Sequence, residues 1–226
     1  MFHLIAFDLD GTLVDSRQDI ADAVNATLVA FGARPLSEES IGRMVGDGAP
    51  TLIARAFAAS GVAPRDALDR FLSMYDDRLL NHTRPYAGIL EVLDELSSRA
   101  ALAVLTNKPI AATRRILAGL DLSRYFRPDC IVGGDGPFPR KPDPAGLAHL
   151  MALAGAPADA TALVGDSVVD WRTARGAATR ICLARYGFGF DGFPVDQIGA
   201  GDWVVDSPDE IPGCLFAKTS AEPASR

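Results

Sequence analysis

The chain has few cysteines, few histidines and no long apolar run, and each shortage excludes a class of protein. Its three cysteines, Cys130, Cys182 and Cys214, are widely separated and lack the spacing of a zinc site. We therefore expect reduced thiols in a cytoplasmic protein. The three histidines have no catalytic triad or metal-binding pattern around them. No apolar stretch approaches a membrane span, and the first residues lack the basic and apolar regions of a signal peptide, so we expect no membrane partner.

Positive charge is also scarce. Lysine and arginine total 22 against 29 aspartate and glutamate residues, which gives a net charge of −7. This balance argues against a nucleic-acid partner, which would require a basic face. It does not exclude a phosphorylated substrate, because a metal ion and a lysine can supply positive charge locally.

The length and the apolar content allow a sizeable core. A chain of 226 residues, 48% of them apolar, fits one large domain or one domain that carries a smaller insertion. We leave a monomer and a homodimer open as alternatives.

Strand-like and helix-like segments alternate from residue 86 onward. Short apolar runs predict strands, and periodic apolar positions predict helices between them. This rhythm indicates an α/β fold, in which a doubly wound, Rossmann-like parallel sheet has helices on both faces. The predicted strands are 2–7, 130–132, 101–105, 161–164, 181–183 and 203–205, and the predicted helices are 89–97, 110–120, 145–153 and 168–175.

Residues 16–84 interrupt this rhythm, because they predict helices only. The expected helices are 18–31, 38–45, 50–59 and 65–81, and Ser37 is a good N-cap for the second. We interpret 16–84 as an inserted α-helical cap domain and residues 1–15 with 85–216 as the core domain. The connections near Asp15 and Thr83 would be hinges beside the site. Residues 217–226 are small and polar, and we expect a disordered tail.

Four polar clusters follow predicted strands or open predicted helices. In a parallel sheet the carboxyl ends of the strands lie along one edge, so these clusters can converge. They are Asp8 to Thr12, Thr106 to Lys108, Lys141 to Pro144 and Gly165 to Asp170.

The two aspartates that follow the first strand are the strongest single signal. Asp8 and Asp10 come directly after a strand that is apolar on both faces. Buried carboxylates without partners are costly, so such a pair usually binds a cation or shares a proton. Asp166 and Asp170 lie four residues apart and therefore on one face of a helix. Each cluster taken alone also fits a turn, a helix cap or a surface lysine.

The four clusters in this order resemble the haloacid dehalogenase superfamily, in its branch of aspartate- and magnesium-dependent phosphatases. The resemblance covers nearly the whole chain and implies a Mg²⁺ cofactor and a small phosphorylated metabolite as partner. It assigns Asp8 as the nucleophile that forms an aspartyl-phosphate and Asp10 as the general acid and base. The implied metal ligands are Asp8, Asp10 through its backbone carbonyl, Asp166 and Asp170, and the implied phosphate-binding residues are Thr106, Asn107 and Lys141.

A charge count supports the need for Lys141. The four aspartates carry up to four negative charges, and a magnesium ion with Lys141 compensates three of them, so the site can accept a phosphate dianion. Ser16 and Lys108 receive no role at this point, and Ser16 is interpreted as the N-cap of the first cap helix.

Further details are similar to the phosphoglycolate phosphatases, which implies 2-phosphoglycolate as the substrate. The cap loop 41–48 is expected to contact the substrate and to determine substrate specificity. Arg43 could pair with a carboxylate, and Gly46 would allow close backbone approach. The segments that carry this likeness are Asp15-Ser16, Arg43 to Gly48, Pro85 to Gly88, Thr106 to Lys108, Lys141-Pro142 and Tyr186-Gly187.

Several related functions remain open. An inorganic pyrophosphatase, a sugar phosphatase or a β-phosphoglucomutase would share these motifs. A true haloacid dehalogenase would lack the aspartate at position 10. A non-catalytic binding protein on this fold would be expected to have lost a motif residue, and all four clusters are intact. The glycine-rich segment 188–201 is longer than the family pattern.

Overall fold

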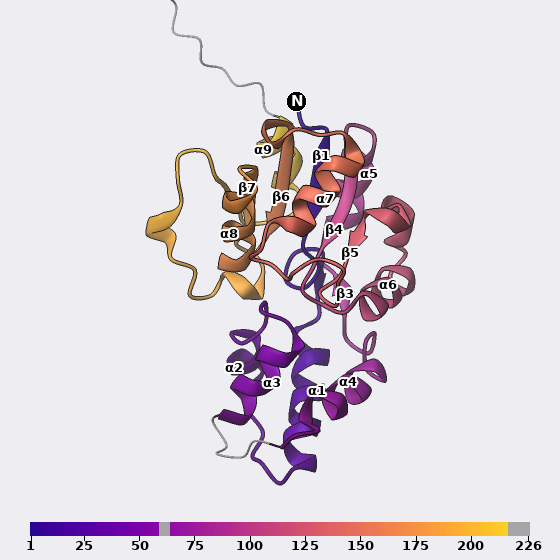
Figure 1. The fold of residues 1–226 in the computed structure, drawn as a ribbon, viewed down its shortest axis with the longest axis vertical. Coiled ribbons are helices and arrows are strands. Elements are labelled where there is room, and N and C mark those ends of the chain that lie inside the picture. Colours follow the sequence, from indigo (N-terminus) through magenta and orange to yellow (C-terminus); the bar gives the residue numbers. More distant parts are fainter. Residues whose placement is uncertain (59–63, 217–226) are drawn as a thin grey trace, which may run out of the picture.

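A computed structural model describes residues 1–58 and 64–216 and contains a six-stranded parallel sheet (Figure 1). This sheet confirms the predicted α/β fold class. The strand order is β5-β4-β1-β6-β7-β8. The strands are β1 (Leu4–Phe7), β4 (Ala101–Leu105), β5 (Ile131–Val132), β6 (Thr161–Gly165), β7 (Arg180–Ala184) and β8 (Trp203–Val205).

β1 lies between β4 and β6, and its register aligns the three strand ends. Phe7 pairs with Val104 on one side and with Val164 on the other. All four residues of β1 are buried, because helices cover both faces of the sheet. The residues that directly follow these strands therefore emerge at one edge.

Two apolar clusters fill the space between the sheet and its helices. Alternate residues of β1 enter different clusters: Ile5 and Phe7 pack on one face, and Leu4 and Ala6 on the other. The first face is covered by α5 (Ile89–Ser97), α6 (Ile110–Gly119) and α9 (Glu210–Phe216), and the second by α7 (Ala145–Ala154) and α8 (Val168–Gly176). The sequence analysis did not predict α9.

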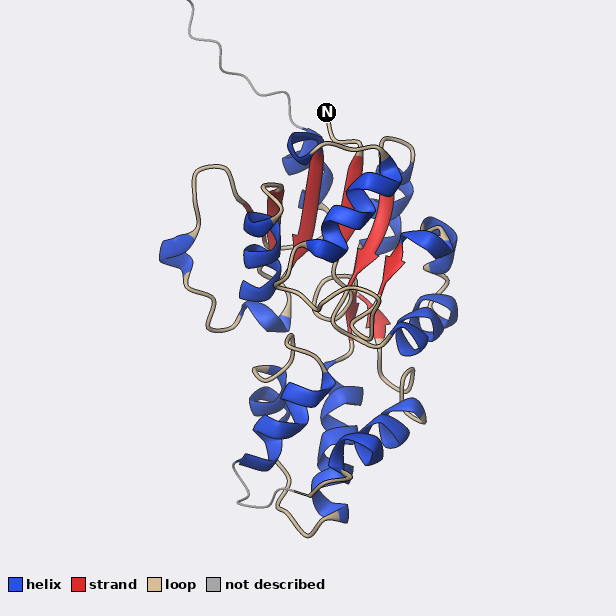
Figure 2. Cartoon of the chain, viewed as in Figure 1, coloured by secondary structure: helices blue, strands red, loops and turns tan. Residues whose placement is uncertain are grey.

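Four helices pack together beyond the carboxyl edge of the sheet, in the lower half of Figures 1 and 2. They are α1 (Arg17–Ala30), α2 (Glu38–Gly42), α3 (Ala49–Ala58) and α4 (Ala67–Asp76). The predictions 38–45 and 65–81 are too long, since turns follow Gly42 and Asp76. Residue 59 of the predicted helix 50–59 and the expected tail 217–226 lie outside the described residues.

Two short strands connect the four helices to the rest of the chain. β2 (Val14–Asp15) pairs antiparallel with β3 (Arg84–Pro85). The two segments that link these helices to the sheet therefore pair with each other, at the positions where the sequence predicted hinges. The division into a core (1–15 and 85–216) and a cap (16–84) stays a prediction. No helix among the described residues has the length and apolar character needed to cross a membrane.

Candidate active site

Three buried aspartates meet at the carboxyl edge of the sheet. Asp8 follows β1, Asp166 follows β6, and Asp170 lies in the first turn of α8. One carboxylate oxygen from each lies within 4.8 Å of the others. Oxygen donors of this kind are the ligands that magnesium prefers, so this group has the composition of a metal site.

Lys141 lies between two of these carboxylates. Its Nζ is 2.9 Å from Asp8 Oδ1 and 2.6 Å from Asp170 Oδ1, and its side chain is 2% exposed. A buried ammonium group in this position compensates part of the negative charge and still borders the Asp8 carboxylate.

The side chain of Asn107 holds the backbone of Lys141. Asn107 Oδ1 accepts from Lys141 N at 2.8 Å, and its Nδ2 donates to Lys141 O at 2.9 Å. The same Nδ2 donates to Gly46 O at 2.8 Å, which links the α2–α3 loop to the site. Both N–H groups of the Asn107 amide therefore donate to backbone carbonyls, and its binding of phosphate stays a prediction.

The N-terminus of α8 fixes Asp170. Ser167 and Asp170 form a capping box, in which the Asp170 carboxylate accepts from Ser167 N and Oγ. Its other oxygen accepts from Lys141. Asp170 is thus oriented by a helix cap on one side and by the buried ammonium group on the other.

Backbone without side chains encloses Asp166. Gly11 has a φ of +84°, and a Cβ atom at this residue would lie 1.8 Å from Asp166 Oδ2. Gly189, from the glycine-rich segment, donates its N–H to the same oxygen at 2.7 Å. Only glycine permits so close an approach at these two positions.

Burial controls the protonation of this cluster. It raises the pKa of Asp8 to about 6, aided by the charge of Asp170 and opposed by Lys141. Burial, with the charges of Asp170 and Asp8, also raises the pKa of Asp166 well above its usual value. A bound cation would favour the charged carboxylates and reverse this effect.

Asp10 has two partners that the sequence analysis left without a role. Lys108 Nζ lies 2.7 Å from Asp10 Oδ2 and 2.9 Å from Oδ1, and Ser16 Oγ donates to Oδ1 at 2.5 Å. Ser16 occupies the N-cap position of α1, as predicted, but its hydroxyl makes no capping hydrogen bond and donates to Asp10 instead. The signal for Lys108 was its place directly after Thr106 and Asn107 at the end of β4.

Lys108 also changes the charge count of the site. Four ionised aspartates with two buried ammonium groups leave two negative charges, which one divalent cation would neutralise.

A cavity of about 410 Å³ separates these residues from the helices beyond the sheet edge. Thr106, Asn107 and Gly46 line it, and their contact with a substrate stays a prediction. Arg43 does not line it: its guanidinium pairs with Glu39 at 2.9 Å and with Asp191 at 2.8 Å, beside a different hollow. Recognition of the substrate by Arg43 stays a prediction. In this structure Arg43 lies outside the cavity that Asp8 borders.

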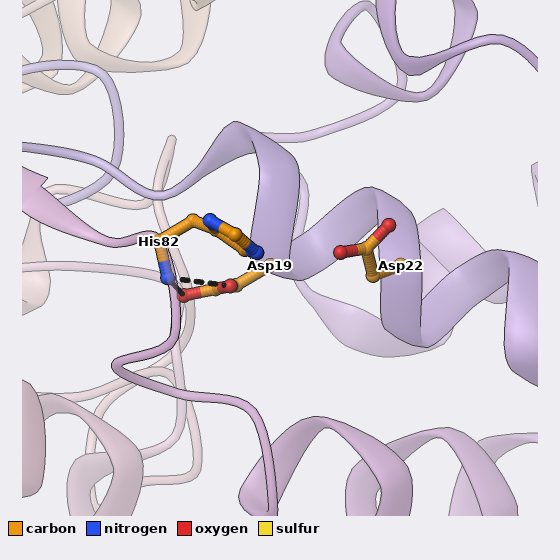
Figure 3. A group of neighbouring side chains, drawn as sticks. All are labelled: Asp19, Asp22 and His82. Atoms are coloured by element: carbon orange, nitrogen blue, oxygen red, sulfur yellow. Dashed lines mark hydrogen bonds between the residues drawn. The ribbon is translucent and has the colours of Figure 1, made fainter.

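A second group of possible metal ligands, Asp19, Asp22 and His82 (Figure 3), is not part of the lining of this cavity. Asp19 is buried, and its carboxylate accepts from the backbone N–H groups of His82 and Thr83 and from Thr83 Oγ1 at 2.7–3.0 Å. These hydrogen bonds give Asp19 a structural role, because they connect α1 to the segment that precedes β3.

Comparisons with known proteins agree with this arrangement. The family model described as haloacid dehalogenase-like hydrolase matches residues 5–184. A phosphoglycolate phosphatase of Rhodospirillum rubrum is 40% identical and aligns over 88% of this chain and 90% of its own length. One of Caulobacter vibrioides is 37% identical over 96% and 92%. The crystal structure of a predicted phosphoglycolate phosphatase from Haemophilus somnus 129PT has a TM-score of 0.85 and 30% identity, over 93% and 96%.

Proposed function

The chain belongs to the haloacid dehalogenase-like hydrolase family, and we propose that it hydrolyses 2-phosphoglycolate with Mg²⁺ through a phosphorylated Asp8. The relatives named as phosphoglycolate phosphatases support a phosphoric monoester hydrolase and this substrate. The observation that carries the proposal is the buried Asp8 carboxylate, which borders the cavity beside Lys141 and two further aspartates.

Each residue has a distinct task in this proposal. Asp8 attacks phosphorus and the bond between phosphorus and the leaving oxygen breaks, while Asp10, which carries a proton at this stage, gives that proton to the leaving oxygen. The Asp10 carboxylate then takes a proton from the water that hydrolyses the aspartyl-phosphate. Lys141 stabilises the charge on the phosphoryl group, and the Thr106 hydroxyl binds one of its oxygens. The helices beyond the sheet edge exclude water while Asp8 carries the phosphoryl group.

The donor set fits Mg²⁺. Asp8, Asp166 and Asp170 would hold the ion, with the backbone carbonyl of Asp10 as the further ligand that the family resemblance implies. When bound, it would offset the charge repulsion between the carboxylates and the phosphate dianion.

The first test is phosphate release from a panel of phosphoesters in the presence of Mg²⁺. We expect 2-phosphoglycolate to give the highest kcat/KM among 2-phosphoglycolate, pyrophosphate, glucose phosphates, nucleotides and p-nitrophenyl phosphate. Higher activity on pyrophosphate or a sugar phosphate would keep the mechanism and reject the substrate. Interconversion of glucose phosphates without net phosphate release would indicate the mutase.

Metal-free protein should lose stability as the pH rises from about 4 to about 6. The pKa of Asp8 is about 6 in the folded protein against an ordinary value of 3.8, so the folded state holds this proton more tightly than the unfolded state. Stability from this group is therefore complete below pH 4 and lost through pH 6, by up to about 3 kcal/mol. Mg²⁺ should oppose the loss, because it binds the ionised carboxylates.

Urea unfolding with EDTA or with Mg²⁺ across this pH range measures both effects. The free energy of unfolding of the wild type is compared with that of Asp8→Asn, which has no proton to lose at this position. If the free energy of unfolding changed equally with pH for the two proteins in EDTA, Asp8 would not be the source of the stability loss.

A further inference from the structure

Lys108 is the only cation among the described residues that line the cavity. Its side chain is 5% exposed and forms two hydrogen bonds, one to each oxygen of Asp10. An ammonium group has three donors, so the third N–H can be shared between the nearby Tyr75 hydroxyl and a ligand. Because Asp10 is the proposed donor to the leaving oxygen, an anion bound at Lys108 would lie close to that oxygen.

The hydroxyl of Tyr75 is the second observation. Tyr75 lies in α4, lines the same cavity and is 5% exposed. Its oxygen has no hydrogen bond of normal geometry among the described residues, and the one charged group that interacts with it closely is the Lys108 ammonium, whose Nζ is 4.7 Å from the ring centroid. Burial raises the pKa of this phenol to about 12, so it keeps its proton at neutral pH. Buried hydroxyls without partners are rare in native proteins, so this one indicates a ligand atom.

The surroundings hold the two groups in place and limit the ligand. The Phe71 ring stacks on Tyr75 with centroids 5.6 Å apart, which fixes the direction of the hydroxyl. The wall around them is mostly apolar and includes Leu52, Leu72 and Leu79. A hexose would leave many hydroxyls without partners against this wall.

We propose that Lys108 and Tyr75 form the binding site for a second anionic group of the substrate, a carboxylate on the carbon next to the ester oxygen. The inference rests on the proposed function and extends it, since it assigns recognition of the carboxylate to these residues and not to Arg43. Lys108 follows β4, whereas Tyr75 belongs to the helices beyond the sheet edge. A carboxylate that contacts both would therefore hold these helices against the sheet.

The test compares two ligands of similar size, 2-phosphoglycolate and 2-hydroxyethyl phosphate, which has an alcohol in place of the carboxylate. Binding is measured by calorimetry with Mg²⁺ in the Asp8→Asn protein, with and without Tyr75→Phe, so the result does not depend on turnover. We expect Tyr75→Phe to lower the preference for 2-phosphoglycolate roughly 10- to 100-fold, the usual effect of one hydrogen bond to a charged group.

Tyr125→Phe is the matched control, because that hydroxyl is bonded to Asp94 outside the cavity. It should leave the preference unchanged. The melting temperature of Tyr75→Phe should equal or exceed that of its parent, which would distinguish lost recognition from lost structure. An unchanged preference in Tyr75→Phe, or no binding of either ligand, overturns the inference. The proposed function fails separately if the wild type releases no phosphate from 2-phosphoglycolate.

Discussion

Replacement of Asp8 with asparagine is expected to reduce phosphate release by roughly 10⁴-fold or more. The carboxylate oxygen that would attack phosphorus is replaced by an uncharged amide, and no second carboxylate beside it is held in the same way. Asp166 is enclosed by Gly11 and Gly189, and Asp170 is engaged by Ser167 and Lys141. The measurement is kcat/KM for 2-phosphoglycolate, with rapid acid quench to detect phosphate bound to the protein.

Asp143→Asn is the matched control for this change. Asp143 is exposed and accepts one hydrogen bond from Ala145 N near the start of α7. It should keep wild-type turnover. Phosphorylated protein in Asp8→Asn, or turnover near that of the wild type, would contradict Asp8 as the nucleophile.

Replacement of Lys141 with methionine should both inactivate and destabilise the protein. The change keeps most of the side-chain volume but removes the ammonium group between Asp8 and Asp170. Two buried carboxylates then lose their neutralising partner, and breaking a buried ion pair in this way costs about 3–5 kcal/mol. Urea unfolding in EDTA measures the free energy, and phosphate release measures the activity.

Mg²⁺ should restore part of the stability of Lys141→Met, since it supplies positive charge to the same carboxylates. Activity should stay low, because the charge beside the phosphoryl group is still missing. Arg114→Met, at an exposed position of α6, should change neither quantity. Wild-type stability of Lys141→Met in EDTA would contradict the charge balance described for the site.

The sequence predicted the strand ends well for a simple geometric reason. Asp8, Thr106 and Asp166 directly follow strands of one parallel sheet, and the carboxyl ends of such strands coincide. Local pattern and chain order are sufficient for contacts of this kind. The expectation that Asp166 and Asp170 share one face of a helix is wrong, because α8 begins at Val168 and Asp166 precedes its N-cap; the two meet because the end of β6 adjoins the first turn of α8.

Contacts between side chains from distant segments could not be obtained in this way. Lys108 meets Asp10 across 98 positions, and Arg43 meets Asp191 across 148. From the sequence alone, Lys108 received no role and Arg43 was expected to pair with the substrate, because a basic residue near a predicted site loop shows no sign of its partner. The directions in which these two side chains point depend on how the loops pack, and the pattern of apolar residues in the sequence does not encode that packing.

The sequence by itself therefore determined the α/β sheet, the helical block at 16–84 and the set of aspartates with Lys141, because these depend on apolar periodicity and on strand order. Only the tertiary structure decided which cation borders Asp10 and that the Asn107 amide holds the Lys141 backbone. It also decided that Tyr75 lines the cavity and has a buried hydroxyl without a normal hydrogen bond among the described residues. These features depend on the packing of α4 and the loops against the sheet edge. Burial then sets the charge and the hydrogen-bonding needs of each group.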